Sequence, residues 1–210
     1  MNPTELVDLS PVIPVIVIDD LATSVDLARA LVAGGVRALE VTLRSPAALE
    51  AIRAIHGQVP EAVVGVGTVR TAQQLDAAIS AGARFGVSPG LTEDLARAAT
   101  GCGIPFLPGV ATASEAMRAA ELGFNVLKLF PAEAVGGIPL LKSWFGPLPE
   151  LRFCPTGGIH AANMGAYLAL PNVRCVGGSW LTPKEAILHH DWESITTLAR
   201  HAVSQAQPKP

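Results

Sequence analysis

The feature that most constrains the fold of this chain is a regular alternation between two kinds of segment. Runs rich in Val, Ile and Leu alternate with alanine-rich stretches in which apolar residues recur at helical spacing. A nearly unbroken apolar run indicates a strand buried on both faces, and the intervening helices are the crossovers that parallel strands need. The pattern therefore predicts parallel strands joined by helices.

This alternation predicts eight strands and eight helices. The strands are expected at residues 12–18, 37–43, 62–66, 84–88, 105–109, 124–130, 151–156 and 173–177, and the helices at 21–33, 46–56, 72–81, 92–100, 113–122, 138–144, 161–169 and 191–206. Eight strand–loop–helix units are typical of the parallel, eight-stranded (β/α)8 TIM barrel. A doubly wound open sheet is the alternative, which is disfavoured because no GxGxxG motif follows the first apolar run.

The domain organisation follows from an even composition. The chain has 210 residues without a linker-like change of composition, so we expect a single barrel domain spanning residues 1–210. Half the residues are hydrophobic and 16% are charged, a balance that excludes disorder. We expect residues 1–11 to form a cap segment over the barrel floor and residues 207–210 to be a frayed tail.

Charge and residue spacing exclude several classes of partner. The formal net charge is −3, which disfavours nucleic acid. Every apolar run is far shorter than the roughly 18 residues that span a bilayer, and the N-terminus lacks a signal-peptide pattern, so we expect a cytoplasmic protein that contacts no membrane. The three cysteines and five histidines have no metal or disulfide spacing. We expect no metal and no cofactor, and we place the histidines at the surface or at helix ends.

The first candidate for chemistry lies in the second apolar run. In a (β/α)8 barrel the active site lies at the carboxyl ends of the strands. Alternation along the run places Glu40, Thr42 and Arg44 on one face, which directs a carboxylate into the barrel. Because a buried charge is costly without a partner or a task, Glu40 is either an ion-pair partner of Arg44 or a functional group.

The sixth run carries a lysine in an otherwise apolar strand. Lysine is almost never fully buried without a reason. If Leu127 and Leu129 pack against the outer helices, Lys128 points into the barrel mouth. Lys128 is then either a structural ion-pair partner or a nucleophile that forms a Schiff base, which requires the neutral amine that an apolar site favours.

The last two runs each end in a glycine pair. They read Thr156-Gly157-Gly158 and Gly177-Gly178-Ser179. The loops after strands seven and eight of a (β/α)8 barrel often bind phosphate through backbone N–H groups, and glycine permits the close approach. One such pair indicates only a tight turn, but two at these positions favour a phosphorylated ligand.

Several strings in a fixed order carry a resemblance to a known family. They are LEVTLR (39–44), VGVGTV (64–69), SPG (88–90), KLFPAE (128–133), RFCPTGGI (152–159) and GGSW (177–180). The chain resembles the 2-keto-3-deoxy-6-phosphogluconate (KDPG) aldolase / 4-hydroxy-2-oxoglutarate aldolase family over about residues 14–202. The resemblance implies a homotrimeric (β/α)8 barrel and a class I aldolase that cleaves KDPG into pyruvate and glyceraldehyde 3-phosphate in the Entner–Doudoroff pathway.

The resemblance also assigns a role to each matching residue. It makes Lys128 the Schiff-base lysine and Glu40 the acid/base residue. The remaining roles are carboxylate binding by Arg44 and Thr68, an apolar wall of Pro89 and Phe130, and phosphate binding by Thr156, Gly157, Gly158, Gly178 and Ser179. The chain departs from the family at Val135, where Asn is frequent, and at His160, where Ser or Thr is frequent. Both departures leave the substrate preference open.

Three alternatives to this function stay open. An aldolase of the same family for 2-keto-3-deoxy-6-phosphogalactonate or 4-hydroxy-2-oxoglutarate would share the imine chemistry. A phosphosugar isomerase or epimerase would use carboxylates or a metal instead. A non-catalytic phosphosugar-binding barrel would keep both glycine pairs, but it would have no need of Lys128 opposite Glu40.

Overall fold

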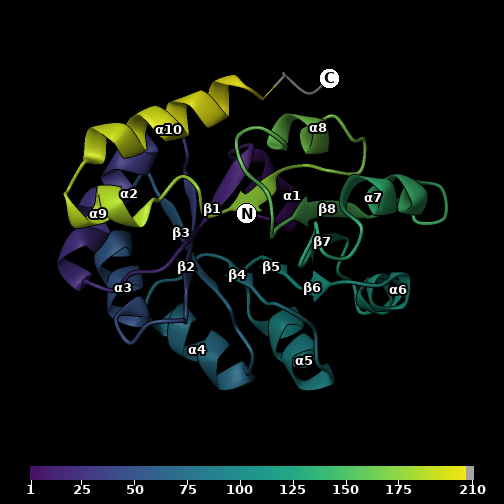
Figure 1. Ribbon diagram of the computed structural model, residues 1–210. Helices are drawn as coiled ribbons and strands as arrows, with labels where there is room; N and C mark the ends of the chain where they lie inside the picture. The colour runs from purple at the N-terminus through teal and green to yellow at the C-terminus, as the bar shows by residue number, and fades with distance from the viewer. Residues whose placement is uncertain (207–210) are drawn as a thin grey trace.

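The computed structural model describes residues 1–206, so the tail expected at residues 207–210 lies outside the described residues. It is an α/β fold in which helices surround a centre of parallel strands (Figure 1). The strands in this part of the chain are β1 (Val12–Ile16), β2 (Ala38–Thr42), β3 (Val63–Gly67), β4 (Gly86–Val87), β5 (Phe106–Leu107), β6 (Gly109–Val110), β7 (Val126–Leu129), β8 (Arg152–Pro155) and β9 (Val176–Gly178).

Most of the helices follow the strands in the alternating order that the sequence predicts, and the described residues have further helices at Pro3–Asp8 and Lys184–Leu188. The helices are α1 (Pro3–Asp8), η1 (Leu21–Thr23), α2 (Ser24–Ala33), α3 (Ala48–Gln58), α4 (Ala72–Ser80), α5 (Glu93–Gly101), α6 (Ala113–Glu121), α7 (Gly137–Phe145), α8 (Met164–Leu168), α9 (Lys184–Leu188) and α10 (Trp192–Ser204). The threonines that precede α4, α5 and α6 cap these helices, because each side chain accepts a hydrogen bond from a backbone N–H of the first turn. No helix of the described residues is long and apolar enough to cross a membrane.

The strands form two parallel sheets rather than one continuous sheet of eight. A six-stranded sheet has the order β5-β4-β3-β2-β1-β9, and a three-stranded sheet has the order β6-β7-β8. The chain passes from one sheet to the other at Pro108, between β5 and β6. Proline has no N–H to donate to a ladder, so the strand expected at residues 105–109 is divided there. Isolated parallel bridges connect the two sheets between β8 and the segment of β9, and one of them pairs Thr156 with Gly177.

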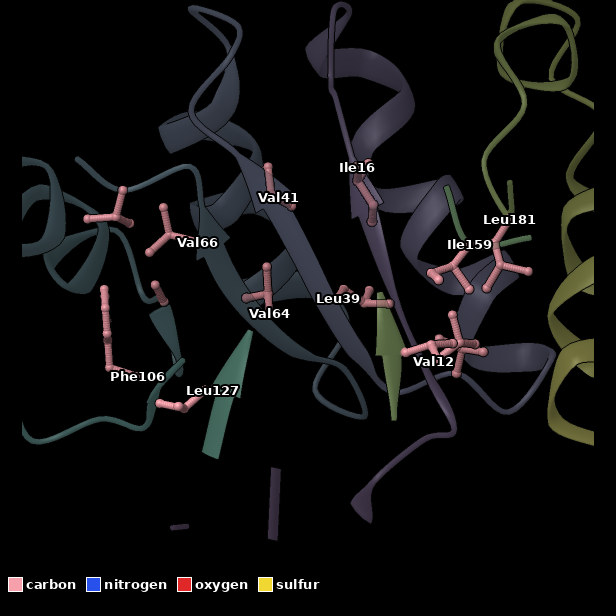
Figure 2. Close-up of a cluster of buried hydrophobic side chains, with 14 of the residues drawn as sticks. Val12, Ile16, Leu39, Val41, Val64, Val66, Phe106, Leu127, Ile159 and Leu181 are labelled. Carbon is pink, nitrogen blue, oxygen red and sulfur yellow. The ribbon is translucent and has the colours of Figure 1, made fainter. Parts of the chain in front are cut away.

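Alternation along the strands separates two hydrophobic clusters. Residues such as Leu39, Val41 and Leu127 lie in a large cluster that also contains residues of the surrounding helices. Figure 2 shows part of this cluster, with its side chains spread across neighbouring strands. The residues next to them in sequence, Ala38 and Val126, belong to a second cluster on the other face of the strands. Glu40 and Lys128 share that inner face, two residues further along β2 and β7.

Helix α1 contributes to the inner cluster. Leu6 and Val7 of α1 are buried there, in a cluster that includes the first residues of β2, β3 and β7. At its end, Asp8 accepts two hydrogen bonds of 2.7 Å from Nη2 of Arg174, one to each carboxylate oxygen. The inner face is therefore apolar at its amino end, and the charged residues Glu40 and Lys128 lie beyond it toward the carboxyl end.

Candidate active site

A cavity of about 1020 Å³ opens at the carboxyl ends of the strands. Its walls come from both sheets, with residues in or just after β1, β2, β3, β7, β8 and β9. Every residue to which the sequence gives a site role lines this one cavity: Glu40, Arg44, Thr68, Pro89, Lys128, Phe130, Thr156, Gly157, Gly158, Gly178 and Ser179. The structure therefore brings together residues that are spread over 140 positions of the sequence.

The centre of the cavity is an ion pair between β7 and β2. Lys128 Nζ lies 3.3 Å from Glu40 Oε1, and the exposed fractions of the two side chains are 7% and 3%. Lys128 Nζ also lies 5.3 Å from the centroid of the Phe130 ring, within the range of a cation–π contact. The ion pair considered between Glu40 and Arg44 is not formed: Glu40 pairs instead with Lys128, which is 88 residues away in sequence.

Glu40 packs directly on the backbone of the neighbouring strand. It is paired in register with Gly65 of β3, and its carboxylate leans over Gly67 at the end of that strand. A Cβ atom added to Gly67 would lie 2.2 Å from Glu40 Oε1, closer than any real contact. The absence of a side chain at Gly67 thus creates the space in which the carboxylate faces Lys128.

Arg44 is oriented by a buried hydroxyl. Thr42 donates a hydrogen bond of 2.8 Å to the Ile16 carbonyl and accepts one of 3.1 Å from Arg44 Nε. Because the Thr42 proton is committed to Ile16, its oxygen is available only as an acceptor. The terminal nitrogens of the Arg44 guanidinium are left for an anion in the cavity, and a planar guanidinium suits a carboxylate.

The wall beside this pair contains a strained residue and a close backbone contact. Thr68 has φ 61°, a left-handed conformation that is rare for a β-branched residue. Strain of this kind persists where the surroundings hold it, and it is frequent at functional sites. Beyond the neighbouring strand β4, a Cβ atom on Gly109 would lie 2.3 Å from the Pro89 carbonyl, so glycine at this position allows Pro89 to reach the site.

The two glycine pairs lie side by side. Gly157 and Gly158 have φ values of 97° and 81°, which only glycine adopts without strain. The hydroxyl-bearing residue before them, Thr156, bridges to Gly177 of β9, where a Cβ atom would lie 2.2 Å from Thr156 Oγ1. Gly157, Gly158 and Gly178 all line the cavity, so backbone of two adjacent loops borders it, an arrangement that suits a phosphate group.

The cavity also has residues that sequence reasoning did not single out. They are Val15, Val17, Asp19, Asp20, Thr23, Ile159, Thr182, Pro183, Lys184, Ile187, Leu188 and His190. Most belong to the segment after β1 or to α9 and its flanks. The sequence carried no pattern that predicted α9. His190 is exposed, as expected of the histidines, yet it also lines the cavity.

These features define what the site can do chemically. A buried amine faces a carboxylate, an arginine is available for an anion, and two glycine loops are suited to a second anion. Among residues 1–206, no group of three or more His, Cys, Asp or Glu side chains is arranged to hold a metal ion. The geometry suits covalent chemistry at an amine on a substrate that carries two negative groups.

A family model described as KDPG and KHG aldolase matches residues 4–198. The chain belongs to the KDPG and KHG aldolase family. This match confirms the family that the sequence strings indicate. It also makes the protein an aldolase.

Relatives within the KDPG and KHG aldolase family are similar over nearly the whole chain. The KHG/KDPG aldolase of Escherichia coli is 54% identical over 197 residues, which are 94% of this chain and 92% of the relative. The 2-dehydro-3-deoxy-phosphogluconate aldolase of Pseudoalteromonas atlantica is 52% identical over 196 residues, 93% of this chain and 91% of the relative.

Solved structures of the family share the fold. The KDPG aldolase of Legionella pneumophila, with pyruvate captured as a covalent carbinolamine intermediate, matches with a TM-score of 0.95 at 48% identity over 97% of this chain and 98% of that chain. The 2-keto-3-deoxy-6-phosphogluconate aldolase of Zymomonas mobilis with 3-phosphoglycerate matches with a TM-score of 0.91 at 49% identity, over 95% of this chain and 94% of that chain.

Proposed function

We propose that this chain is a class I aldolase, a carbon–carbon lyase that reversibly cleaves KDPG into pyruvate and glyceraldehyde 3-phosphate, the aldol step of the Entner–Doudoroff pathway. The observation that carries the proposal is the buried Lys128 amine, 3.3 Å from the Glu40 carboxylate in the cavity. The Legionella pneumophila relative, in which pyruvate is held as a covalent carbinolamine, supports the same chemistry here.

Lys128 is the proposed nucleophile. Lys128 first passes a proton to Glu40, and its neutral amine then attacks the C2 carbonyl carbon of the substrate to give a carbinolamine. Glu40 returns that proton to the carbinolamine oxygen, which leaves as water and gives an iminium ion. The C3–C4 bond then breaks, its electron pair moves to C3 to form an enamine, and the C4 hydroxyl proton passes to Glu40. Glu40 returns a proton to C3, and water hydrolyses the resulting iminium to release pyruvate and the Lys128 amine.

The remaining cavity residues bind the two ends of the substrate in this proposal. Arg44 and Thr68 hold the carboxylate, while Pro89 and Phe130 form the apolar wall around the imine. The phosphate is bound by Thr156, Gly157, Gly158, Gly178 and Ser179. The positive φ values of Gly157 and Gly158 support this assignment, since they form a tight loop without side chains that a phosphate group can approach closely.

The same family resemblance leads to a proposal about how the two sheets are arranged. We propose that the two sheets together make a closed (β/α)8 barrel forming a single domain over residues 1–210, capped at its floor by residues 1–11. The bridge between Thr156 and Gly177 and the passage through Pro108 support closure. The assembly is proposed to be a cytoplasmic homotrimer, as the family resemblance implies, acting on small-molecule substrates alone.

A second substrate is favoured by one comparison. The Escherichia coli relative, 54% identical, is named for both KHG and KDPG. We therefore propose 4-hydroxy-2-oxoglutarate as a further substrate, because it shares the 2-keto acid half on which the imine forms. Parallel cleavage assays on both compounds and on 2-keto-3-deoxy-6-phosphogalactonate would rank them by kcat/KM.

The first test of this function is chemical trapping of the nucleophile. Incubation with pyruvate and sodium borohydride is expected to add one reduced pyruvyl group, which peptide mapping places on Lys128. Lys128→Arg keeps the positive charge but lacks the amine, so neither the adduct nor cleavage is expected. An adduct on another lysine, or full turnover by Lys128→Arg, would overturn the assignment.

Glu40 is tested by separating imine formation from proton transfer. Glu40→Gln keeps the shape and the hydrogen-bonding oxygen but removes the base. We expect borohydride trapping of pyruvate to persist, while kcat for cleavage falls about 10²- to 10⁴-fold, the usual contribution of a general acid/base. A kcat equal to that of the native protein would refute the role of Glu40.

A further inference from the structure

The motif that carries Lys128 ends in a residue to which the proposed mechanism gives no role, Glu133. Its carboxylate accepts a hydrogen bond from the hydroxyl of Tyr167 in α8. Its side chain also lies against the phosphate loop, because a Cβ atom on Gly158 would be 2.4 Å from Glu133 Cγ. Glu133 therefore connects α8 with the back of the loop that faces the cavity.

Tyr167 is held firmly in this contact. It is fully buried and is the single tyrosine of the chain. Burial raises the pKa of the Tyr167 hydroxyl far above its usual range, and the hydrogen bond to Glu133 raises it further. The phenol thus remains a hydrogen-bond donor at any physiological pH. The start of α7 leaves room for it, since a Cβ atom on Gly137 would lie 2.6 Å from the Tyr167 hydroxyl oxygen.

Backbone hydrogen bonds join the same two segments. The Ala132 N–H donates to the Thr156 carbonyl at 2.7 Å, and the Glu133 N–H donates to the Gly157 carbonyl at 3.1 Å. Two backbone hydrogen bonds therefore join the segment that follows Lys128 to the loop that begins at Thr156. The Glu133 side chain continues this contact past Gly157 to Gly158, where no further backbone bond to the segment is available.

We propose that Glu133 and Tyr167 form a clamp that holds Gly157 and Gly158 in the conformation that binds the substrate phosphate. The two are positioning residues, acting through the loop, and they set the preference for phosphorylated over unphosphorylated substrates. This inference rests on the proposed function, because it concerns the phosphate half of the same substrate.

The physical reason lies in the freedom of glycine. Two successive glycines have many accessible conformations, and fixing them before the ligand arrives avoids an entropic cost at binding. Removing the Tyr167 hydroxyl releases the Glu133 carboxylate from the position that supports the loop. The released carboxylate is also free to approach the dianion, which opposes binding.

The test compares two substrates that differ only in the phosphate. We expect Tyr167→Phe and Glu133→Ala each to lower kcat/KM for KDPG by roughly five- to tenfold, the scale of one lost hydrogen bond, mainly through KM. For 2-keto-3-deoxygluconate, which lacks the phosphate, kcat/KM is expected to stay within twofold. Glu133→Gln keeps an acceptor oxygen and is expected to restore most of the preference. Ser143→Ala, which removes the hydroxyl that bonds the Pro139 carbonyl in α7, is the matched control.

The coupling of the two residues gives a second readout. If they act as one clamp, the double variant Tyr167→Phe/Glu133→Ala is expected to lose no more than the worse single variant. Because Tyr167 is the one tyrosine, its hydrogen bond is followed at neutral pH by near-ultraviolet difference absorbance. Glu133→Ala is expected to shift the tyrosine band, and an unchanged band would show that the pair is absent in solution.

Two outcomes would overturn the clamp. One is an equal loss on both substrates, which indicates a general structural role, and the other is no loss on either. Borohydride trapping of pyruvate on Lys128 in the native protein tests the proposed function separately from the clamp. If trapping succeeds and the variants keep the native preference, the clamp alone is wrong.

Discussion

At the scale of single residues, the site depends on positions that have no side chain as much as on those that react. Gly67 is the clearest case, because the Glu40 carboxylate occupies the space where a Cβ atom would be. Gly109 does the same for the approach of Pro89. Glu40, one member of the proposed reacting pair, is therefore positioned by close packing against bare backbone.

Gly67→Ala is expected to displace Glu40 and to lower kcat for cleavage about 100-fold, since a shift near 1 Å in a catalytic group has effects of that size. Steady-state cleavage of KDPG measures this loss. Gly57→Ala in α3, where an added Cβ meets nothing within 4 Å, is the control and is expected to keep native activity. Native kcat in Gly67→Ala would mean that the position of Glu40 is unimportant.

The sequence pointed to Lys128 and Glu40, the proposed reacting residues, because their chemistry conflicts with their surroundings. A lysine within an apolar strand and a glutamate on the inner face of another are anomalies that a strand pattern makes visible. Asp19 and Lys184 also line the cavity, but they lie outside the strands. Charged residues in such segments are ordinary in any sequence, so no anomaly marked them. Tyr167 was missed because a tyrosine on a helix is an ordinary core residue.

At the scale of elements, helix positions were predicted more accurately than strand ends. Helix ends carry local information, as at α5, where Thr92 accepts a hydrogen bond from the Leu95 N–H. Strand ends depend instead on partners distant in sequence. The division at Pro108 follows from its missing N–H, but its effect appears only once both neighbouring strands are in place. Helix α9 has no buried residue and therefore no apolar periodicity to predict it.

The cap of α10 gives a pH-dependent prediction. Two hydrogen bonds lower the pKa of Asp191 below its ordinary value of 3.8. The one from the Ser194 hydroxyl has the larger effect, and the one from the Ser194 backbone N–H adds to it. The unfolded state therefore binds the proton more tightly, so the cap stabilises the fold above pH 3.8 and this contribution is lost as the pH falls through the lowered pKa.

Thermal unfolding between pH 6 and pH 3 checks this sign. Asp191→Ala is expected to have a lower Tm than the native protein at pH 6, with the difference shrinking below about pH 3.8. The control is Thr92→Ala, whose lost hydroxyl cap does not titrate. It is expected to cost about 1 kcal/mol at every pH. A pH-independent deficit in Asp191→Ala would contradict the prediction.

At the scale of the whole molecule, the inner face of the strands is divided along its length. Its amino end is filled by apolar side chains that include Leu6 and Val7 of α1, and its carboxyl end holds the Lys128–Glu40 pair. Stability and chemistry therefore occupy opposite ends of the same interior. The sequence predicted a cap before the first strand, but the helical form of residues 3–8 was not evident from so short a segment.

Leu6→Ala is expected to lower the free energy of unfolding by about 2–5 kcal/mol, the usual cost of truncating a buried leucine. Urea unfolding measures the change. Leu188→Ala, at a leucine whose side chain is 70% exposed, is the control and is expected to change stability by less than about 0.5 kcal/mol. A loss in Leu6→Ala no larger than in the control would show that α1 is not part of the core.

The ion pair at the centre of the cavity joins the two sheets, since β2 lies in the six-stranded sheet and β7 in the three-stranded one. Each sheet thus carries one member of the proposed reacting pair, and we expect neither to be active by itself. If the chain is cut between β5 and β6, we expect two fragments without aldolase activity. Activity is expected again only when the two fragments associate. Catalysis in this protein is therefore a direct assay for assembly of the complete fold.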